Sequence, residues 1–293
     1  MKELKKDLRE VNNYYIDNIK NIKTLAVNYN KRKKEEYYKL LINLEKYRKE
    51  GIVFIVEDLS RTVNFSAIKE AKEIELRIGK AKLFSITGLD SNPVFSLCKI
   101  LWVRENYPKV YEKAYKWLQM TDYIIYKLSG VIATDYSLAS RTLAFDVLNS
   151  KMSEHILQEF GVSKDLFPQI VNGGTYLGEV SKKASKETGL NTDVKVVMGG
   201  HDHPCAALAA NALGGGKVLD SSGTAESFIM ISDKGKTPVM QPKGQRVCRY
   251  LDSRRYTYWA GIISSGATFE WAYQRLKDSE FWQFGNSDFG YTD

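Results

Sequence analysis

The clearest pattern of apolar and polar positions lies in the middle of the chain, at residues 193–213. Its first part, 194–197, is rich in valine and predicts a buried strand. The Gly-Gly pair at 199–200 permits a sharp turn, and the small residues of 206–213 favour a helix. Asp202 is therefore expected between the carboxyl end of a strand and the start of a helix, the position that faces the ligand crevice in open α/β folds.

The remaining pattern predicts a mixture of helices and strands. Short apolar runs predict strands at 52–56 and near 178–180. Residues 217–224 with 227–232, and 246–251 with 255–260, predict two hairpins. The helical pattern covers, in chain order, residues 63–79, 95–127 with a break at Tyr107-Pro108, 153–160, 181–188 and 267–277. This arrangement is typical of an α/β protein.

Three segments of different character divide the sequence. Residues 1–50 predict an atypical basic helical segment. Residues 51–213 predict a first domain, and the triple glycine at 214–216 marks its boundary. Residues 217–293 predict a second domain that is only partial, because nothing in the final tail closes a second core.

Composition and charge exclude several classes of protein. The net charge is +8, but residues 1–50 carry 14 Lys and Arg against 8 Asp and Glu, so most of the excess lies on one helical face and predicts no nucleic-acid partner. No run of 18 apolar residues predicts a membrane span, and the N-terminus lacks a secretory signal. Three dispersed cysteines predict free thiols in the cytoplasm. The sequence is compatible with a homo-oligomer.

Asp202 is the first candidate for chemistry. A carboxylate at this position can act as a general base or can cap the helix. His201 and His203 flank it and invite a metal site, but spacing of this kind needs further ligands from elsewhere, so no metal is predicted. Asp135 and Arg141 either line a polar pocket or form an internal ion pair.

A second candidate follows about twenty residues later, where Gly223-Thr224 ends a predicted strand. A glycine beside a hydroxyl residue in a tight turn offers backbone N–H groups and an O–H group to a phosphate oxygen.

Together, Gly199-Gly-His-Asp202 and Gly223-Thr224 resemble the motifs of the FGGY family of carbohydrate kinases. The resemblance covers roughly residues 60–275. Further matches follow the family's order: Leu83-Phe-Ser-Ile-Thr-Gly88, Lys99-Ile-Leu-Trp102 with Asn106-Tyr-Pro108, Asp122-Tyr-Ile-Ile-Tyr-Lys-Leu-Ser-Gly130, Asp135-Tyr-Ser-Leu-Ala-Ser-Arg141 and Ala260-Gly-Ile-Ile-Ser-Ser-Gly266.

This resemblance implies a fold of two ribonuclease-H-like (actin-like ATPase) α/β domains and the ATP-dependent phosphorylation of a sugar or polyol hydroxyl group. Asp202 is implied as the general base, with ATP and Mg²⁺ as cofactors, since positioning and electrostatics dominate phosphoryl transfer. The implied nucleotide-binding residues are Gly223, Thr224 and Gly266, and the implied substrate-binding residues are Arg61, His201, His203, Asp135 and Arg141.

The sequence also departs from the family pattern. No Asp-x-Gly-Thr phosphate loop lies near the N-terminus, and the family's Trp-x-Asp-x-Arg segment appears as Glu57-Asp-Leu-Ser-Arg61. The chain stops at Asp293, before the adenosine-binding half, so the sequence predicts a family member truncated at both ends. Two alternatives stay open: an inactive remnant that binds a sugar or a protein partner, and a metal-dependent hydrolase that uses His201, Asp202 and His203.

Overall fold

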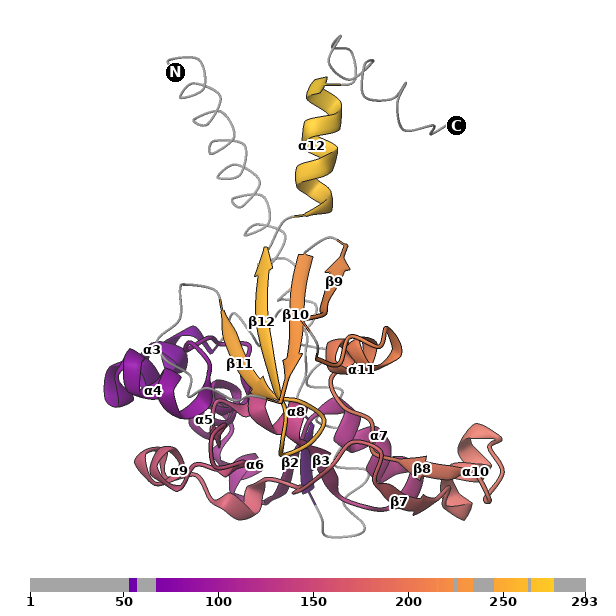
Figure 1. Ribbon diagram of the computed structural model, residues 1–293. Helices are drawn as coiled ribbons and strands as arrows, with labels where there is room; N and C mark the ends of the chain where they lie inside the picture. Colours follow the sequence, from indigo (N-terminus) through magenta and orange to yellow (C-terminus); the bar gives the residue numbers. More distant parts are fainter. Residues whose placement is uncertain are drawn as a thin grey trace.

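The computed structural model describes a broad α/β unit and an antiparallel sheet that stands on it (Figure 1). The described residues are 53–56 (backbone only), 67–214, 216–223, 226–233, 245–262 and 265–276. The predicted helices of 1–50, together with Arg61 and Thr224, lie outside them.

The helices of the α/β unit follow the predicted pattern in most places. The predicted helix 63–79 is described from Ile68 and ends where expected, at Gly79. The helix predicted at 153–160 is confirmed as α9, with Ser153 as its cap. The helices are α3 (Ile68–Ile78), α4 (Lys80–Thr87), α5 (Ser96–Asn106), α6 (Pro108–Glu112), α7 (Met120–Ser129), α8 (Tyr136–Ala139), α9 (Glu154–Phe160) and α10 (Lys182–Thr188), with 3-10 turns η2 (Ser140–Thr142) and η3 (Lys164–Leu166).

The strands of this unit form four pairs. The parallel pairs are β1 (Val53–Val56) with β2 (Ala114–Leu118), and β3 (Ala133–Asp135) with β6 (Gln169–Val171). The antiparallel pairs are β4 (Phe145–Asp146) with β5 (Lys151–Met152), and β7 (Tyr176–Glu179) with β8 (Lys195–Val197).

Two predictions about these strands were wrong. Residues 114–118 lie in a strand, not in a continuation of the predicted helix 95–127, because they pair with β1 along its whole length. The strand β8 was predicted to be buried, yet only its central residue, Val196, is buried, since β8 pairs with β7 alone.

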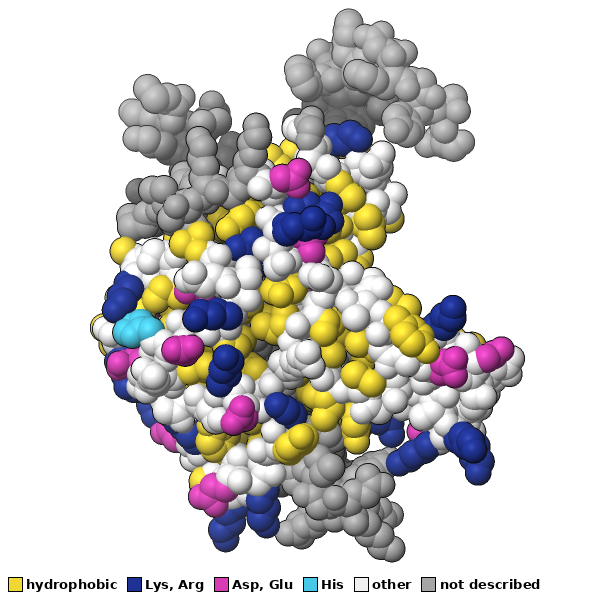
Figure 2. Space-filling model, turned by 60° about the horizontal axis from the view of Figure 1, so that its bottom comes forward, with side chains coloured by type: hydrophobic (Ala, Val, Ile, Leu, Met, Phe, Trp, Pro, Cys, Tyr) yellow, Lys and Arg dark blue, Asp and Glu magenta, His cyan; other side chains and the backbone are white. Residues whose placement is uncertain are grey.

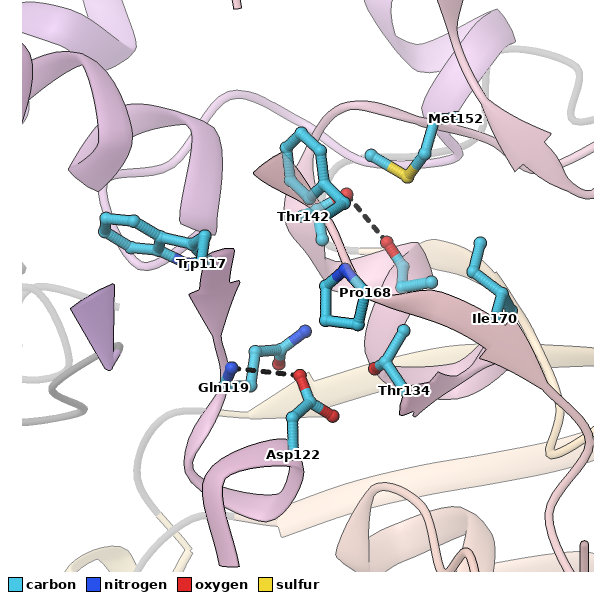
Figure 3. A pocket seen from close by; sticks show the side chains of 10 residues that line it. Trp117, Gln119, Asp122, Thr134, Thr142, Met152, Pro168 and Ile170 are labelled. Carbon is cyan, nitrogen blue, oxygen red and sulfur yellow. Dashed lines mark hydrogen bonds between the residues drawn. The ribbon is translucent and has the colours of Figure 1, made fainter. Parts of the chain in front are cut away.

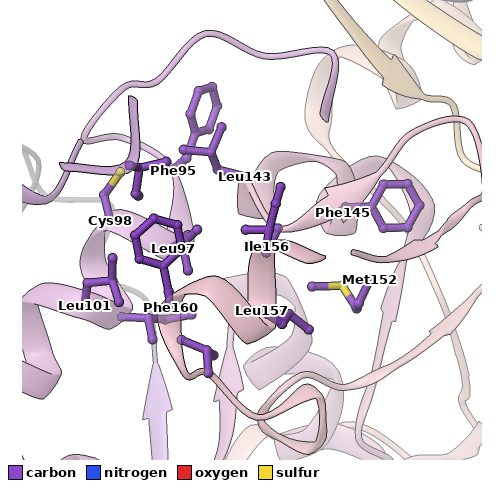
Figure 4. Close-up of a cluster of buried hydrophobic side chains, with 14 of the residues drawn as sticks. Phe95, Leu97, Cys98, Leu101, Leu143, Phe145, Met152, Ile156, Leu157 and Phe160 are labelled. Atoms are coloured by element: carbon purple, nitrogen blue, oxygen red, sulfur yellow. The ribbon is translucent and has the colours of Figure 1, made fainter. Parts of the chain in front are cut away.

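The large core of the α/β unit is built mainly from helices α3, α5 and α9. Along α3, Ala71, Ile74 and Ile78 recur at helical spacing and are buried, whereas Leu76 is 84% exposed. Figure 4 shows the side chains of Leu97 and Leu101 from α5 meeting those of α9. The turns at the edge of the α/β unit are therefore attached to a well-packed core.

The second unit is a four-stranded antiparallel sheet of order β11-β12-β10-β9. It contains both predicted hairpins, β9 (Val218–Ser222) with β10 (Glu226–Ser232) and β11 (Arg246–Arg249) with β12 (Tyr256–Ile262). Helix α12 (Gly266–Leu276) follows the sheet, as predicted.

Helix α11 (Asp202–Ala209) packs on one face of this sheet through Ala207. The helix was predicted to continue to Leu213, but it ends at Ala209 and Asn211 adopts a positive φ of 52°. Helix α11 thus begins at Asp202, as predicted, and covers the sheet with its small residues.

Strand β11 and the loop after it join the two units. The Val247 N–H donates to the Gly88 carbonyl at 2.9 Å, and the Gly173 N–H donates to the Leu251 carbonyl at 2.7 Å. The Arg249 backbone N–H donates to the Ser140 hydroxyl at 2.9 Å. We call these contacts the seam; they hold the sheet against the edge of the α/β unit.

The described surface is mixed in charge. On the face shown in Figure 2, Lys and Arg side chains are interspersed with Asp and Glu and do not gather into one basic patch. Within the described residues, none of the helices has the length and apolar character needed to cross a membrane. All three cysteines are free thiols.

Candidate active site

The turn between β8 and α11 is fitted tightly against the α/β unit and the seam. A Cβ atom at Gly200 would lie 2.2 Å from Leu251 Cδ2 and 3.0 Å from Asp135 Oδ2, so a larger residue would force the buried Leu251 side chain to shift. The Met198 N–H donates to the Thr175 carbonyl at 2.9 Å and fixes the start of the turn. The turn therefore holds His201, Asp202 and His203 in a defined position.

Asp202 presents an exposed carboxylate at the first residue of α11. Its side chain is 78% exposed, and its contacts all fall on one oxygen, Oδ1. Nδ1 of His201 lies 2.6 Å from Oδ1 and Nδ1 of His203 lies 2.9 Å away, while the His203 backbone N–H donates to the same oxygen at 2.7 Å. Among the described residues, none donates a hydrogen bond to Oδ2.

These contacts set the protonation state of the site. The His201 contact is the main reason that the pKa of Asp202 lies well below its ordinary value, so the carboxylate is ionised at neutral pH. Burial lowers the pKa of His201, and the nearby charge of Arg141 acts in the same direction. The Nδ1 atom of His203, 2.9 Å from Oδ1, makes the side-chain hydrogen bond that orients the carboxylate, whereas Nδ1 of His201 lies close to Oδ1 without the geometry of a hydrogen bond.

Asp135 is fully buried and is linked to the turn through the side chain of Ser137. Its Oδ2 accepts from the Ser137 hydroxyl at 2.7 Å, and the Ser137 oxygen accepts from the His201 backbone N–H at 2.9 Å. Its two oxygens also cap α8 by accepting from the backbone N–H groups of Ser137 and Leu138. Burial raises the pKa of Asp135 to about 6. Contact of Asp135 with a sugar stays a prediction.

Arg141 and Trp259 complete the site. The Arg141 guanidinium lies 5.5 Å from the centre of the Phe95 ring and 5.2 Å from that of Trp259. The Trp259 ring in turn lies 5.0 Å from His201 and 5.1 Å from His203. Sequence reasoning missed Trp259, because its position more than fifty residues downstream gives no local signal.

The predicted nucleotide residues Gly223 and Gly266 meet at one end of the sheet. The Gly266 N–H donates to the Gly223 carbonyl at 3.0 Å, which places the start of α12 beside the end of β9. The hydroxyl of Ser265 is buried there and has no hydrogen-bond partner among the described residues. A helix N-terminus beside a glycine turn fits a phosphate group.

The turn that carries His201 and His203 and the contact between Gly223 and Gly266 lie along one sheet. Trp259, which touches the histidines, is three residues before Ile262, or roughly 10 Å at the rise of an extended strand. Ile262 pairs with Glu226 and Glu226 with Ser222, the residue before Gly223.

One small cavity is distinct from this site. It lies between β2, β3 and η2 and is lined by Trp117, Gln119, Asp122, Thr134, Ala139, Thr142, Met152, Phe167, Pro168 and Ile170 (Figure 3). With a volume of about 10 Å³ it holds at most one water molecule. It is too small for a sugar.

The side chains of His201, Asp202 and His203 also offer three ligand atoms within 4.8 Å of one another. All three come from consecutive residues, and both imidazoles are already directed at the same carboxylate oxygen. The arrangement fits hydrogen bonding to Asp202.

Comparison with known proteins shows the family to which the chain belongs. A model of the N-terminal domain of the FGGY family of carbohydrate kinases matches residues 62–209, which is half of the chain, and the chain belongs to this family. Its fold is the ribonuclease-H-like (actin-like ATPase) fold that the sequence predicted.

Individual relatives are sugar kinases. L-fuculokinase from Escherichia coli (strain K12) is 32% identical over 200 residues, which are 68% of this chain and 42% of that protein. Xylulose kinase from Bacillus subtilis (strain 168) is 36% identical over 140 residues, 48% of this chain and 28% of that protein.

Among solved structures, xylulose kinase from Lactobacillus acidophilus has a TM-score of 0.64 at 22% identity, covering 71% of this chain and 42% of that one. Gluconate kinase from the same organism has a TM-score of 0.65 at 22% identity, covering 73% and 43%. The chain thus spans about two fifths of the length of L-fuculokinase and of these two structures.

Proposed function

We propose that this chain acts in the phosphorylation of a sugar hydroxyl group by ATP, with Asp202 as the general base. The observation that carries the proposal is the geometry of Asp202, whose side chain is exposed while its Oδ1 is hydrogen-bonded to Nδ1 and the backbone N–H of His203 and contacted by Nδ1 of His201. A hydroxyl group that reaches Oδ2 can transfer its proton there as its oxygen attacks a phosphoryl group.

The residues around the base have separate tasks in this proposal. The neutral imidazole of His201 lies against the carboxylate, and the ring and backbone nitrogen atoms of His203 hold its Oδ1 in place. The Arg141 guanidinium, beside Trp259, supplies a positive charge for substrate oxygens. The Ser137 hydroxyl, which donates to Asp135, accepts from the backbone N–H of His201 and thereby fixes the position of the turn.

Gly223, Gly266 and the N-terminus of α12 fit a nucleotide phosphate, on the evidence of the buried Ser265 hydroxyl beside them. When bound, ATP with Mg²⁺ supplies the phosphoryl group and neutralises its charge. Thr224 and Arg61 keep their predicted roles in the phosphate and sugar sites.

The substrate class follows from the relatives. Because the relatives include L-fuculokinase, xylulose kinase and gluconate kinase, we propose a small sugar or sugar acid as substrate. The three free thiols support a reducing, cytoplasmic location.

The test is a coupled ADP-release assay with L-fuculose, xylulose, gluconate and a panel of aldoses and polyols. Asp202→Asn should lower kcat by about 10²–10⁴-fold and leave sugar binding, measured by calorimetry, unchanged. Asp193→Asn, an exposed aspartate nearby, is the matched control and should keep full activity. Turnover that survives Asp202→Asn would show that another group is the base.

A further inference from the structure

We propose that Trp259 is a positioning residue that holds the imidazoles of His201 and His203 against Asp202 from the sheet of the second unit. The inference depends on the proposed function only for the role of Asp202; the contacts themselves can be tested without turnover.

The indole ring lies beside three site residues that come from outside its own sheet. Its centre lies 5.0 Å from the His201 ring at an interplanar angle of 87°, and 5.1 Å from the His203 ring at 64°. Both are edge-to-face geometries, which aromatic pairs prefer. The Arg141 guanidinium also lies over the indole ring, 5.2 Å from its centre.

The backbone that carries the indole is well fixed. Strand β12 lies inside the sheet, where Trp259 is paired with Ile229 of β10 and with Arg246 of β11. Sites built on interior strands hold their side chains more precisely than loops do. The two imidazoles, in contrast, belong to the turn before α11 and to its first residues, so the rigid partner is the tryptophan.

The contact acts on the base through the imidazoles. His201 and His203 stack with their centres 5.8 Å apart, and both direct Nδ1 at Asp202 Oδ1. Their side chains are only 19% and 26% exposed, and the indole provides part of this cover. Rotation of the His203 imidazole away from Trp259 removes a hydrogen bond from the carboxylate, and rotation of the His201 imidazole removes a close contact with it.

Titration of the histidines gives the direct test. The chain has three histidines, so a spectrum of ¹³C-labelled histidine holds His201, His203 and the distant His155 as an internal reference. The groups that face His201 are Asp202, His203 and Arg141. Trp259→Leu keeps apolar bulk but removes the ring. It should move the His201 and His203 signals, leave His155 in place, and raise the pKa of His201 towards its ordinary value.

Two further variants complete the design. Trp259→Phe keeps an aromatic edge-to-face partner and should retain the lowered pKa of His201. Trp271→Leu, at an exposed tryptophan on α12, should leave all three histidines unchanged. Identical His201 and His203 titrations in the wild type and Trp259→Leu overturn the inference. Should Trp259→Leu not fold, loss of the lowered His201 pKa in folded Trp259→Phe overturns it as well.

Kinetics separate this inference from the proposed function. With a substrate that is turned over, Trp259→Leu should lower kcat by up to about 100-fold, with KM nearly unchanged, and Trp259→Phe should restore most of the rate. A wild-type chain without turnover would count against the proposed function, while the histidine titrations would still decide the role of Trp259.

Discussion

The α/β unit and the antiparallel sheet bury their apolar side chains in different ways. The α/β unit surrounds its large core with helices, so that Ile74 and Leu97 are fully buried. Within the described residues, α11 covers one face of the sheet, and on the other face Phe228 and Met230 remain 37% and 38% exposed. The sheet therefore depends on α11 and on the seam, and the candidate active site lies where these meet.

The largest expected effect tests the two faces of the sheet. Ile229→Ala removes a fully buried side chain that faces α11 and should cost about 2–5 kcal/mol of unfolding free energy. Met230→Ala, at the next residue on the open face, should cost about 1 kcal/mol or less. Urea unfolding followed by circular dichroism measures both, and equal costs would mean that the open face is as well packed as the covered one.

The next effect tests the seam. At Gly88, φ is 69° and an added Cβ would lie 2.0 Å from the Val247 carbonyl oxygen. Gly88→Ala combines left-handed strain of about 1–2 kcal/mol with a clash of similar size or larger, so we expect a loss of roughly 2–4 kcal/mol.

Gly130→Ala is the matched control for this substitution. Gly130 also ends a helix with a φ of 80°, but nothing lies within 4 Å of its added Cβ. Gly130→Ala should therefore be destabilised only by the strain of the left-handed backbone. If the two variants unfold at the same urea concentration, strand β11 moves away from Gly88 at little cost.

A third prediction concerns pH and Asp135. Its pKa in the folded protein, about 6, exceeds the ordinary value of 3.8, because burial disfavours the charge. The folded state therefore binds this proton more tightly than the unfolded state does. The resulting stabilisation is complete below about pH 4 and disappears as the pH rises to about 6, with a total of up to about 3 kcal/mol.

Asp135→Asn should remove this dependence. The difference in unfolding free energy between wild type and variant should change steadily between pH 4 and pH 6 and stay constant above that range. Asp193→Asn serves as the exposed control and should show no such change. A constant difference across the range would mean that Asp135 is solvated enough to titrate normally.

Much of the fold could be predicted because the signals were local. Gly79 ends its helix with a positive φ, as predicted, and both predicted hairpins are present. Strand β2 could not be predicted in this way. Its sequence, Ala114–Leu118, also suits a helix, and only pairing with β1, about sixty residues earlier, makes it a strand.

In the candidate site, too, residues with a local sequence signal could be predicted and residues that depend on distant partners could not. Asp202 was singled out from its place between strand and helix and from the family resemblance; Gly223 lies beside Gly266, and the roles of all three stay predictions. Ser137 and Trp259 were missed, since each matters through a partner more than fifty residues away. Asp135 was noted as a pocket or ion-pair residue, but its burial and its bond to Ser137 depend on tertiary packing.

The smallest expected effect concerns the guanidinium group of Arg249, which donates hydrogen bonds at the seam. Arg249 is buried and donates through Nε to Val147, through Nη1 to Ser253 and through Nη2 to Leu148, all to backbone carbonyls at 2.7–2.8 Å. A lysine ammonium group cannot reproduce this planar fork. Arg249→Lys should leave one carbonyl or more without a donor and cost about 1–2 kcal/mol.

Arg254→Lys, at an exposed position in the following loop, is the control and should be neutral. Thermal unfolding of both variants gives the comparison. Should Arg249→Lys be neutral too, water must reach the carbonyls of residues 147 and 148, and the seam would then be a hydrated contact. In that case the position of the sheet, and with it Trp259, would depend mainly on the packing of α11 against Ile229 and Ile231.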